Sequence, residues 1–292
     1  MPTSRILIQL DSDPHPSVFD AVVAVDSGVD QLFQYGGVEP TQVRDLVYGA
    51  MFTRAPDQLH HTAIFVGGSD VSRGEQLLEQ VTRTFFGPMR VSVMLDANGA
   101  NTTAAAAVVA ARSHCQLDQI SALVLAGTGA VGRRVGQLLA AAGSRVTVAS
   151  RSAERAAEVA AVIGSRVPQA QIQGAEVVTR NDLEQLLPDV QLVVSAGAPG
   201  VELLPVDLWQ RHTDSPRVLI DLNAVPPLGI GGVQVTDRAT MHGQTVTYGA
   251  IGVGGLKMKI HRAALQTLFD SNKHVLDAAE IYAIGCQLKG HG

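Results

Sequence analysis

The sequence predicts an α/β protein with two domains, each built on a parallel sheet. Short apolar runs alternate with amphipathic helical stretches along most of the chain, which is typical of parallel strands joined by crossover helices. A glycine-rich turn joins a strand to a helix near the middle of the chain. The length of 292 residues is sufficient for two domains of ordinary size.

The elements of the first domain follow from the spacing of apolar residues. Three apolar runs predict strands, at residues 6–10, 63–66 and 91–95. Helices are predicted over residues 17–25, 75–86 and about 103–112. Ser17 with Asp20 three residues later resembles a capping box, and an apolar stripe of Val18, Ala21, Val22 and Val25 shares one face of that first helix.

The second domain begins near residue 116. Strands are predicted at residues 120–126, 145–149, 190–195 and 218–221. Helices are predicted over residues 130–142, 152–163, 255–268 and 277–288, and residues 222–249 are expected to be loop with one short strand. We place the domains at residues 1–115 and 116–267, with residues 268–292 packing back on the first.

Composition and charge exclude several classes of protein. With 46% hydrophobic and 17% charged residues, the chain has the make-up of a globular protein with a core. A net charge of -5 argues against nucleic acid as a partner, because phosphate binding needs a dense basic face. Cys115 and Cys286 predict neither a disulfide framework nor a metal site. We see no signal peptide and no membrane span, so we expect a cytoplasmic protein.

The glycine-rich turn has the pattern of a dinucleotide-binding site. Gly127, Gly129 and Gly132 follow a strand and open a helix, the setting that a Rossmann fingerprint requires. The first glycine permits the tight turn, the second lets the backbone approach a pyrophosphate, and the third lets the helix pack on the strand. A purely structural glycine turn is the alternative. The predicted cofactor-binding residues of this turn are Gly127, Thr128, Gly129, Ala130, Val131 and Gly132.

The end of the next strand indicates NADP in preference to NAD. NAD-specific sites carry an acidic residue here to bind the ribose hydroxyls, whereas this chain has Ser150, Arg151 and Ser152. These three can donate several hydrogen bonds to a 2′-phosphate, and the arginine supplies charge. The alternative is a solvated Arg151 beside a serine that merely caps the next helix.

Other strand-end loops are the expected ligand sites, because ligands bind beyond the carboxyl ends of strands in open α/β sheets. Ser195, Ala196 and Gly197 offer small residues where a nicotinamide could approach. A second loop follows Asp221 and includes Asn223. In the first domain, residues 96–103 are polar, although a turn with a helix cap at Asn101 or Thr102 is the alternative. Residues 11–16 could likewise be only a rigid turn.

Several of these segments together resemble one enzyme family. Residues 96–103, 125–129, 223–232 and 252–259, with residues 17–20 and 63–68, are similar to the NADP-dependent methylene-tetrahydromethanopterin dehydrogenases of methylotrophic bacteria. The resemblance implies hydride transfer from a methylene-tetrahydropterin to NADP, with tetrahydromethanopterin, tetrahydrofolate or both as the carrier. It also implies a homo-oligomer and an active site in a cleft between two domains. The expected substrate-binding residues are Ser17, Phe19, Asp20, Asp96, Asn98, Asn101, Thr102, Asp221 and Asn223.

The resemblance further suggests Lys257 as the active-site lysine, with Lys259 as the alternative. The two lysines should lie on roughly opposite faces of a helix, so only one can face the site. A cation at the start of a helix is disfavoured by the macrodipole, which makes a merely structural Lys257 unexpected there. Both lysines could instead be solvated. Because hydride loss leaves a cation, Lys257 should have a carboxylate partner, for which Asp20, Asp96 and Asp221 are candidates.

Two other functions stay open at this point. A non-catalytic NADP-binding sensor would keep the glycine turn but would not need polar loops in the first domain. A bifunctional dehydrogenase and cyclohydrolase would need a proton relay, yet Tyr35 and Tyr48 have no lysine near them. No metal site is expected, and His60 with His61 is interpreted as an exposed loop pair.

Overall fold

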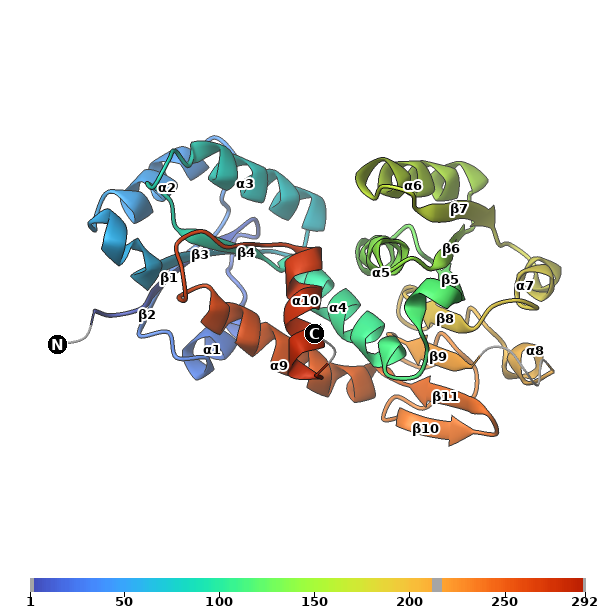
Figure 1. The fold of residues 1–292 in the computed structure, drawn as a ribbon. Helices are drawn as coiled ribbons and strands as arrows, with labels where there is room; N and C mark the ends of the chain where they lie inside the picture. Colours follow the sequence, from blue (N-terminus) through green and yellow to red (C-terminus); the bar gives the residue numbers. More distant parts are fainter. Residues whose placement is uncertain (1–2, 212–216, 291–292) are drawn as a thin grey trace. The chain divides into compact units, whose positions relative to one another are not determined.

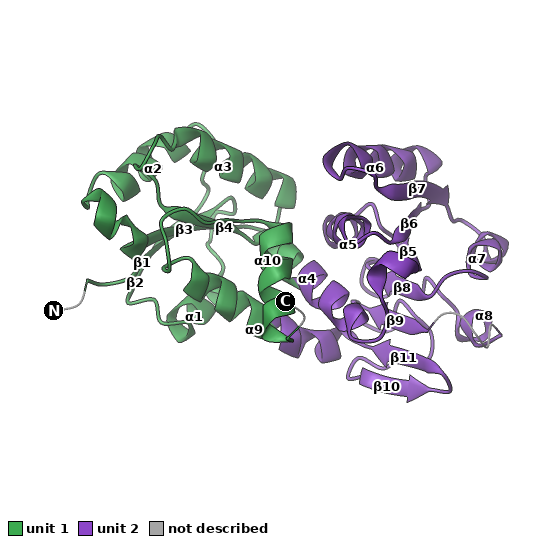
Figure 2. Cartoon of the chain, in the orientation of Figure 1, with its two compact units in different colours: residues 1–102, 258–292 green, residues 103–257 purple. Residues whose placement is uncertain are grey.

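The computed structural model describes residues 3–211 and 217–290, and it divides into two compact units (Figures 1 and 2). Unit 1 comprises residues 1–102 and 258–292, and unit 2 comprises residues 103–257. The chain passes between the units inside two helices, α4 (Ala100–Arg112) and α9 (Ala250–Thr267). The predicted domain boundaries lie just beyond the ends of these same helices. Both units are α/β, as predicted.

Unit 1 is built on a five-stranded sheet in the order β12-β4-β3-β1-β2. The strands are β12 (Val275–Leu276), β4 (Ser92–Leu95), β3 (Thr62–Gly67), β1 (Ile6–Asp11) and β2 (Gln31–Tyr35). Every pairing is parallel. All residues of β3 and β4 are buried, as expected for strands covered on both faces. The C-terminal segment therefore joins unit 1 through β12.

Helices cover both faces of this sheet. Figure 1 shows α1 (Val18–Asp26) on one face and α2 (Val43–Met51) and α3 (Val71–Thr84) on the other. This follows from right-handed crossovers, because the chain moves outward from β1 to β2 and then back across the sheet to β3 and β4. The last helix, α10 (Ala278–Leu288), begins at Asp277 with a capping box.

The apolar stripe predicted on α1 does not face the core. Val23 and Ala24 are the buried residues of this helix, whereas Val18, Val22 and Val25 are 75%, 55% and 59% exposed. Because α1 is apolar almost all round, periodicity could not decide which side packs on the sheet. Ser17 does cap the helix, with its Oγ accepting the N–H of Asp20 at 3.2 Å.

Unit 2 is built on a seven-stranded sheet in the order β10-β11-β9-β8-β5-β6-β7. The strands are β10 (Arg238–His242), β11 (Thr245–Tyr248), β9 (Val218–Asp221), β8 (Leu192–Ser195), β5 (Ser121–Leu125), β6 (Arg145–Ser150) and β7 (Gln171–Glu176). Only β10 runs antiparallel to its neighbour. The direction of winding reverses between β5 and β8, which makes their carboxyl ends the switch point of a Rossmann sheet.

The helices of unit 2 follow this reversal. Figure 1 shows α5 (Ala130–Ala141) and α6 (Ala153–Arg166) on one face and α7 (Arg180–Leu186) and α8 (Val206–Gln210) on the other. Beneath α7 and α8 lies a buried cluster that includes Leu123, Leu219 and Trp209. No helix of the described ranges is long and apolar enough to cross a membrane.

Some elements were not predicted. The single strand expected in residues 222–249 is a hairpin of β10 and β11. The edge strands β2 and β7 were missed because most of their residues are exposed, so they lack the apolar run of a buried strand. The helices α2, α7 and α8 were also missed.

Candidate functional site

The glycine turn connects β5 to α5 at the switch point of unit 2. The Gly127 N–H donates to the Ala149 carbonyl at 2.9 Å, which holds the turn against β6. A Cβ on Gly132 would lie 2.6 Å from the Gly127 Cα, so glycine is required there for the helix to begin this close to the turn. A Cβ on Gly129 would meet nothing nearer than the Ala126 carbonyl oxygen at 3.7 Å. The space beside Gly129 is therefore open.

These features fit the pyrophosphate of a dinucleotide. Gly129 is the N-cap of α5, and no side chain caps the helix. The first N–H groups of α5 are thus left for a ligand, and the helix dipole favours an anion there. The loop after β8 runs beside the turn, since the Ala196 N–H donates to the Leu125 carbonyl at 3.1 Å. Residues 127–132 and 196–197 would hold the cofactor.

The end of β6 presents two arginines at the start of α6. Ser152 caps this helix, with its Oγ accepting the Arg155 N–H at 3.3 Å. The guanidinium groups of Arg151 and Arg155 make no hydrogen bond or ion pair within the described part of the chain. Glu176 caps the same helix by accepting the Ala153 N–H at 3.3 Å. Glu154 in the first turn and Glu176 balance the two arginines in charge, but neither binds a guanidinium group, so both guanidinium groups can donate to a 2′-phosphate.

Arg155 is a candidate that the sequence interpretation missed. It lies four residues after Arg151, which precedes the helix, and it is exposed at the positive end of the α6 dipole. A cation is unfavourable at that end unless an anion binds there. The spacing of Arg151 and Arg155 was the available signal.

A buried cluster holds the loop after β9. Asp221 is fully buried, and its Oδ1 and Oδ2 accept the N–H groups of Asn223 at 3.1 Å and Ile230 at 2.9 Å. A Cβ on Gly229 would clash with the Ser195 Oγ and lie 2.7 Å from the Asp221 Oδ1, so the loop folds directly over both side chains. Ser195 is also fully buried. Asp221 and Ser195 would therefore act on ligands indirectly, by fixing the loop.

Asn223 has a similar role in this loop. Its Oδ1 accepts the Val225 N–H at 2.9 Å, and its Nδ2 donates to the Pro227 carbonyl at 3.2 Å. The loop contains a cis peptide bond between Pro226 and Pro227. Asn223 is only 5% exposed, so direct contact with substrate or cofactor stays a prediction.

We predict that Asp221→Ala lowers the free energy of unfolding by about 1–3 kcal/mol, because the N–H groups of Asn223 and Ile230 would be buried without their acceptor. Denaturant unfolding measures this loss.

Burial raises the pKa of Asp221, and the backbone hydrogen bonds oppose the rise in part. Because the pKa is raised on folding, ionisation of this group lowers stability as the pH rises from the ordinary Asp range through the raised pKa. Unchanged stability in Asp221→Ala would contradict the loop-holding role.

The carboxyl end of β1 in unit 1 carries a second buried carboxylate. Asp11 is 1% exposed, and it accepts the N–H groups of Asp13 at 2.9 Å and Ser17 at 3.1 Å. The Asp13 carboxylate in turn accepts hydrogen bonds from the N–H and the Oγ–H of Ser69, both at 2.9 Å. Residues 11–16 are thus a rigid turn, as one interpretation had it, and this turn also ties β1 to the loop after β3. The turn sets the position of Ser17 at the start of α1, followed by Phe19 and Asp20.

The loop after β4 exposes Asn98 and buries its neighbours. Asn98 has a φ of 53°, and its N–H donates to the Gly68 carbonyl at 2.7 Å. Asp96, Asn101 and Thr102 are at most 1% exposed. The Asn101 Nδ2 donates to the Leu95 carbonyl at 2.6 Å and to the Asp277 Oδ1 at 2.8 Å. These buried residues shape the loop, whereas Asn98 is exposed, and its contact with a ligand stays a prediction.

Neither Asn101 nor Thr102 is the cap of the following helix. Helix α4 already begins at Ala100, and Asp96 supplies the capping oxygen. The Asp96 Oδ1 accepts the Thr102 N–H at 3.0 Å, and its Oδ2 accepts the Thr102 Oγ1–H at 2.7 Å. The alternative of a cap at Asn101 or Thr102 is therefore wrong.

Lys257 lies inside a helix and not near its start. Helix α9 begins at Ala250, so the predicted start near Gly255 is wrong, and the macrodipole argument for Lys257 does not apply. The helix begins early because glycine lets it pack tightly: a Cβ on Gly252 would clash with the Asp237 carbonyl oxygen. Lys257 is half-buried and Lys259 is exposed. A pairing of Lys257 with Asp20, Asp96 or Asp221 stays a prediction.

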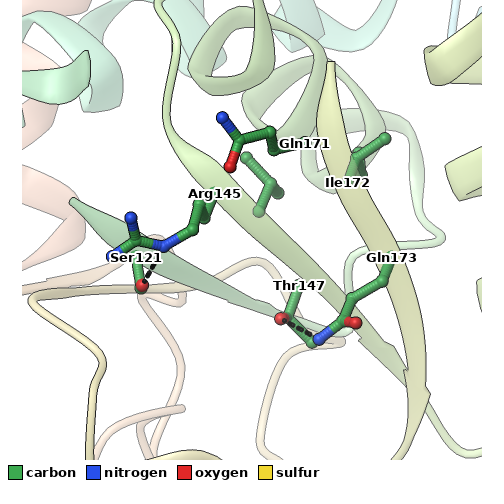
Figure 3. Close-up of a pocket in the computed structure, with 7 residues that line it drawn as sticks. Ser121, Arg145, Thr147, Gln171, Ile172 and Gln173 are labelled. Carbon is green, nitrogen blue, oxygen red and sulfur yellow. Dashed lines mark hydrogen bonds between the residues drawn. The ribbon is translucent and has the colours of Figure 1, made fainter. Parts of the chain in front are cut away.

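A separate pocket of about 390 Å³ lies at the amino ends of β5, β6 and β7 (Figure 3). Its polar lining includes Arg145, whose Nε donates to the Ser121 Oγ at 3.1 Å, and Gln173, whose Nε2 donates to the Thr147 Oγ1 at 3.2 Å. Dinucleotides bind at the opposite, carboxyl edge of such a sheet. This pocket is therefore not the predicted cofactor site.

Neither a metal-ligand cluster nor a reactive Cys115 thiol is found among the described residues. Among them, no three His, Cys, Asp or Glu side chains converge as metal ligands would. Burial raises the pKa of the Cys115 thiol to about 11, so this cysteine is protonated near neutral pH and is a poor nucleophile.

Comparison with known proteins identifies the family. Residues 18–98 match the N-terminal domain of methylene-tetrahydromethanopterin dehydrogenase, and residues 123–206 match the NADP-binding domain of saccharopine dehydrogenase. The chain is 42% identical to the bifunctional protein MdtA of Methylorubrum extorquens over 98% of this chain and 99% of that protein. The chain belongs to the methylene-tetrahydromethanopterin dehydrogenase family. The resemblance seen in the sequence motifs is thus confirmed.

More distant relatives agree with this assignment. A second Methylorubrum extorquens protein, an NAD(P)-dependent methylenetetrahydromethanopterin dehydrogenase, is 28% identical over 98% of this chain and 99% of its own length. Among solved structures, a shikimate 5-dehydrogenase from Mycobacterium fortuitum aligns with a TM-score of 0.54 at 15% identity, covering 98% of both chains. That likeness concerns the fold alone, and it confirms the predicted fold class.

Proposed function

We propose that this protein transfers a hydride from a methylene-tetrahydropterin to NADP and leaves the methenyl form of the pterin. The observation that carries the proposal is the uncapped glycine turn at the switch point of unit 2, in a chain whose unit 1 matches a methylene-tetrahydromethanopterin dehydrogenase domain. The carrier is tetrahydromethanopterin, tetrahydrofolate or both.

The reaction requires little from the protein beyond orientation of the pterin against NADP. A carbon between two nitrogens loses hydride readily, because the nitrogen lone pairs stabilise the cation left behind. When bound, NADP supplies the hydride acceptor. No proton is removed in this step, so the side chains mainly orient the pterin and exclude water.

The residues divide into those that would contact ligands and those that would hold loops. Backbone groups of residues 127–132 would bind the pyrophosphate, and Ser150, Arg151 and Arg155 would bind the 2′-phosphate. In unit 1, Ser17, Phe19, Asp20 and Asn98 lie at carboxyl ends of strands or at the start of α1. These four, with Lys257, are the proposed pterin contacts. Asp96, Asn101, Thr102, Asp221 and Asn223 would act by holding loops.

A kinetic assay tests the function. Purified protein mixed with methylene-tetrahydromethanopterin or methylene-tetrahydrofolate should produce reduced nicotinamide, seen as a rise in absorbance, with NADP and more slowly with NAD. A non-catalytic NADP sensor would bind NADP in a calorimeter but give no such rise. Accumulation of the formyl product in place of the methenyl form would reveal the bifunctional alternative. Failure to reduce NADP with both carriers would overturn the proposal.

The preference for NADP leads to a direct prediction. Arg151→Ala should raise the KM for NADP by roughly 10- to 150-fold, the effect of losing one charge-assisted contact of about 1.5–3 kcal/mol. The KM for NAD should change little, because NAD has no 2′-phosphate. Arg166→Ala, at the far end of the same helix α6, is the matched control and should leave both constants unchanged. Equal NADP constants in Arg151→Ala and wild type would remove this arginine from the site.

The predicted homo-oligomer and cytoplasmic location stay proposals. The exposed stripe of Val18, Val22 and Val25 on α1 supports an oligomer, since exposed apolar patches often mark protein interfaces.

A further inference from the structure

A buried histidine of α9 lies against the loop that exposes Asn98. His261 is 1% exposed, and its Nδ1 is 3.6 Å from the Oδ2 of Asp96, which is equally buried. This distance exceeds that of a hydrogen bond, so the contact is electrostatic. The imidazole also stacks on the Phe65 ring, with centroids 5.8 Å apart and planes at 13°. Phe65 thus restrains the orientation of the imidazole.

The Asp96 carboxylate keeps the loop in shape. It binds the N–H and the hydroxyl of Thr102, which fixes the first turn of α4. The Asp96 N–H donates to the Val66 carbonyl at 3.1 Å, which fixes the other end of the loop on β3. Between these anchors Asn98 adopts its left-handed conformation, which asparagine tolerates better than most non-glycine residues.

A buried carboxylate needs compensation for its lost hydration. Thr102 provides two hydrogen bonds, and the Nδ1 edge of the His261 imidazole lies beside the same carboxylate. His261 is buried, so it can influence a ligand on the exposed face of the loop through Asp96.

We propose that His261 is a positioning residue for the pterin: through Asp96 it fixes the turn that presents Asn98. The inference rests on the proposed function, because it assumes that Asn98 contacts the pterin. Unlike Lys257, which lies one turn earlier on α9, His261 has no direct role in hydride transfer. Its loss should weaken pterin binding and leave NADP binding intact.

Substitution of His261 by two residues of different chemistry separates positioning from packing. His261→Leu removes the polar edge and should weaken binding of methylene-tetrahydromethanopterin, measured by calorimetry without NADP, by about tenfold. His261→Asn places an amide nitrogen near the position of Nδ1 and should restore most of that affinity, although it fills less space than leucine. NADP affinity should stay within about twofold of wild type in both. Gln266→Leu, an exposed position on the same helix, is the matched control.

Thr102→Val provides an independent test, because it removes the hydroxyl on the other side of Asp96. It should reproduce the effect of His261→Leu, and it keeps the proposal testable if His261→Leu fails to fold. Wild-type pterin affinity in either variant, or a failure of asparagine to restore it, would overturn the proposal. Wild-type protein that binds pterin but does not reduce NADP would instead overturn the dehydrogenase function and leave this inference standing.

Discussion

Gly129→Val should abolish measurable NADP binding while the protein stays folded. The side chain would occupy the open space where the pyrophosphate must approach the N-terminus of α5. The loss of two or more charge-assisted contacts corresponds to about 3 kcal/mol or more, which is roughly 100-fold or more in affinity. Folding should be unaffected because Gly129 has a φ of -74° and a Cβ there meets no atom within 3.7 Å. Calorimetric titration with NADP and circular dichroism measure the two effects.

Gly132→Ala is the contrasting control within the same turn. Its methyl group would lie 2.6 Å from the Gly127 Cα and 3.0 Å from the Ala126 carbonyl oxygen, so the helix must move. We expect the free energy of unfolding to fall by about 1–3 kcal/mol, as in other overpacked sites. If Gly129→Val binds NADP as tightly as wild type, the glycine turn does not hold the cofactor.

Lys257→Gln should reduce kcat by about 10- to 100-fold, because a misplaced pterin forfeits part of the advantage of orientation. The pH profile of kcat between pH 6 and pH 9 should keep its wild-type shape, since no general base is removed. Lys259→Gln should be nearly silent, because Lys259 is exposed whereas Lys257 is half-buried on the same helix. Steady-state rates of both variants across this range provide the measurement.

Other outcomes would change the role of the lysines. Full activity in Lys257→Gln with a loss of activity in Lys259→Gln would show that Lys259 is the active-site lysine in place of Lys257. A new pH dependence in Lys257→Gln would indicate proton transfer in place of orientation. Full activity in both variants would remove lysine from the mechanism.

Local signals in the sequence were sufficient to predict the glycine turn and the starts of several helices. The turn at residues 127–132 and the caps at Ser17 and Ser152 depend on neighbouring residues, and the structure has them where they were predicted. The predicted start of α9 was too late in the chain, because glycines usually weaken a helix. Here Gly252 is kept inside the helix by its close approach to Asp237, which is a tertiary contact.

The roles of the polar residues could not be predicted in the same way. Asp96 and Asp221 follow strands, so the sequence indicated ligand contacts, but the structure buries both and surrounds them with donors from their own loops. Burial depends on how distant segments pack. The periodicity of apolar residues carries no information on that packing. His261 shows this most clearly, because only the fold brings α9 against the loop after β4.

The central claim is direct hydride transfer from the methylene carbon of the pterin to NADP. The most direct measurement uses methylene-tetrahydromethanopterin prepared with two deuterium atoms on that carbon and follows the label by mass spectrometry. The account predicts one deuterium in each reduced nicotinamide, one retained in the methenyl product and a slower reaction than with the unlabelled substrate. Reduced nicotinamide without deuterium, or no reduction at all, would contradict it.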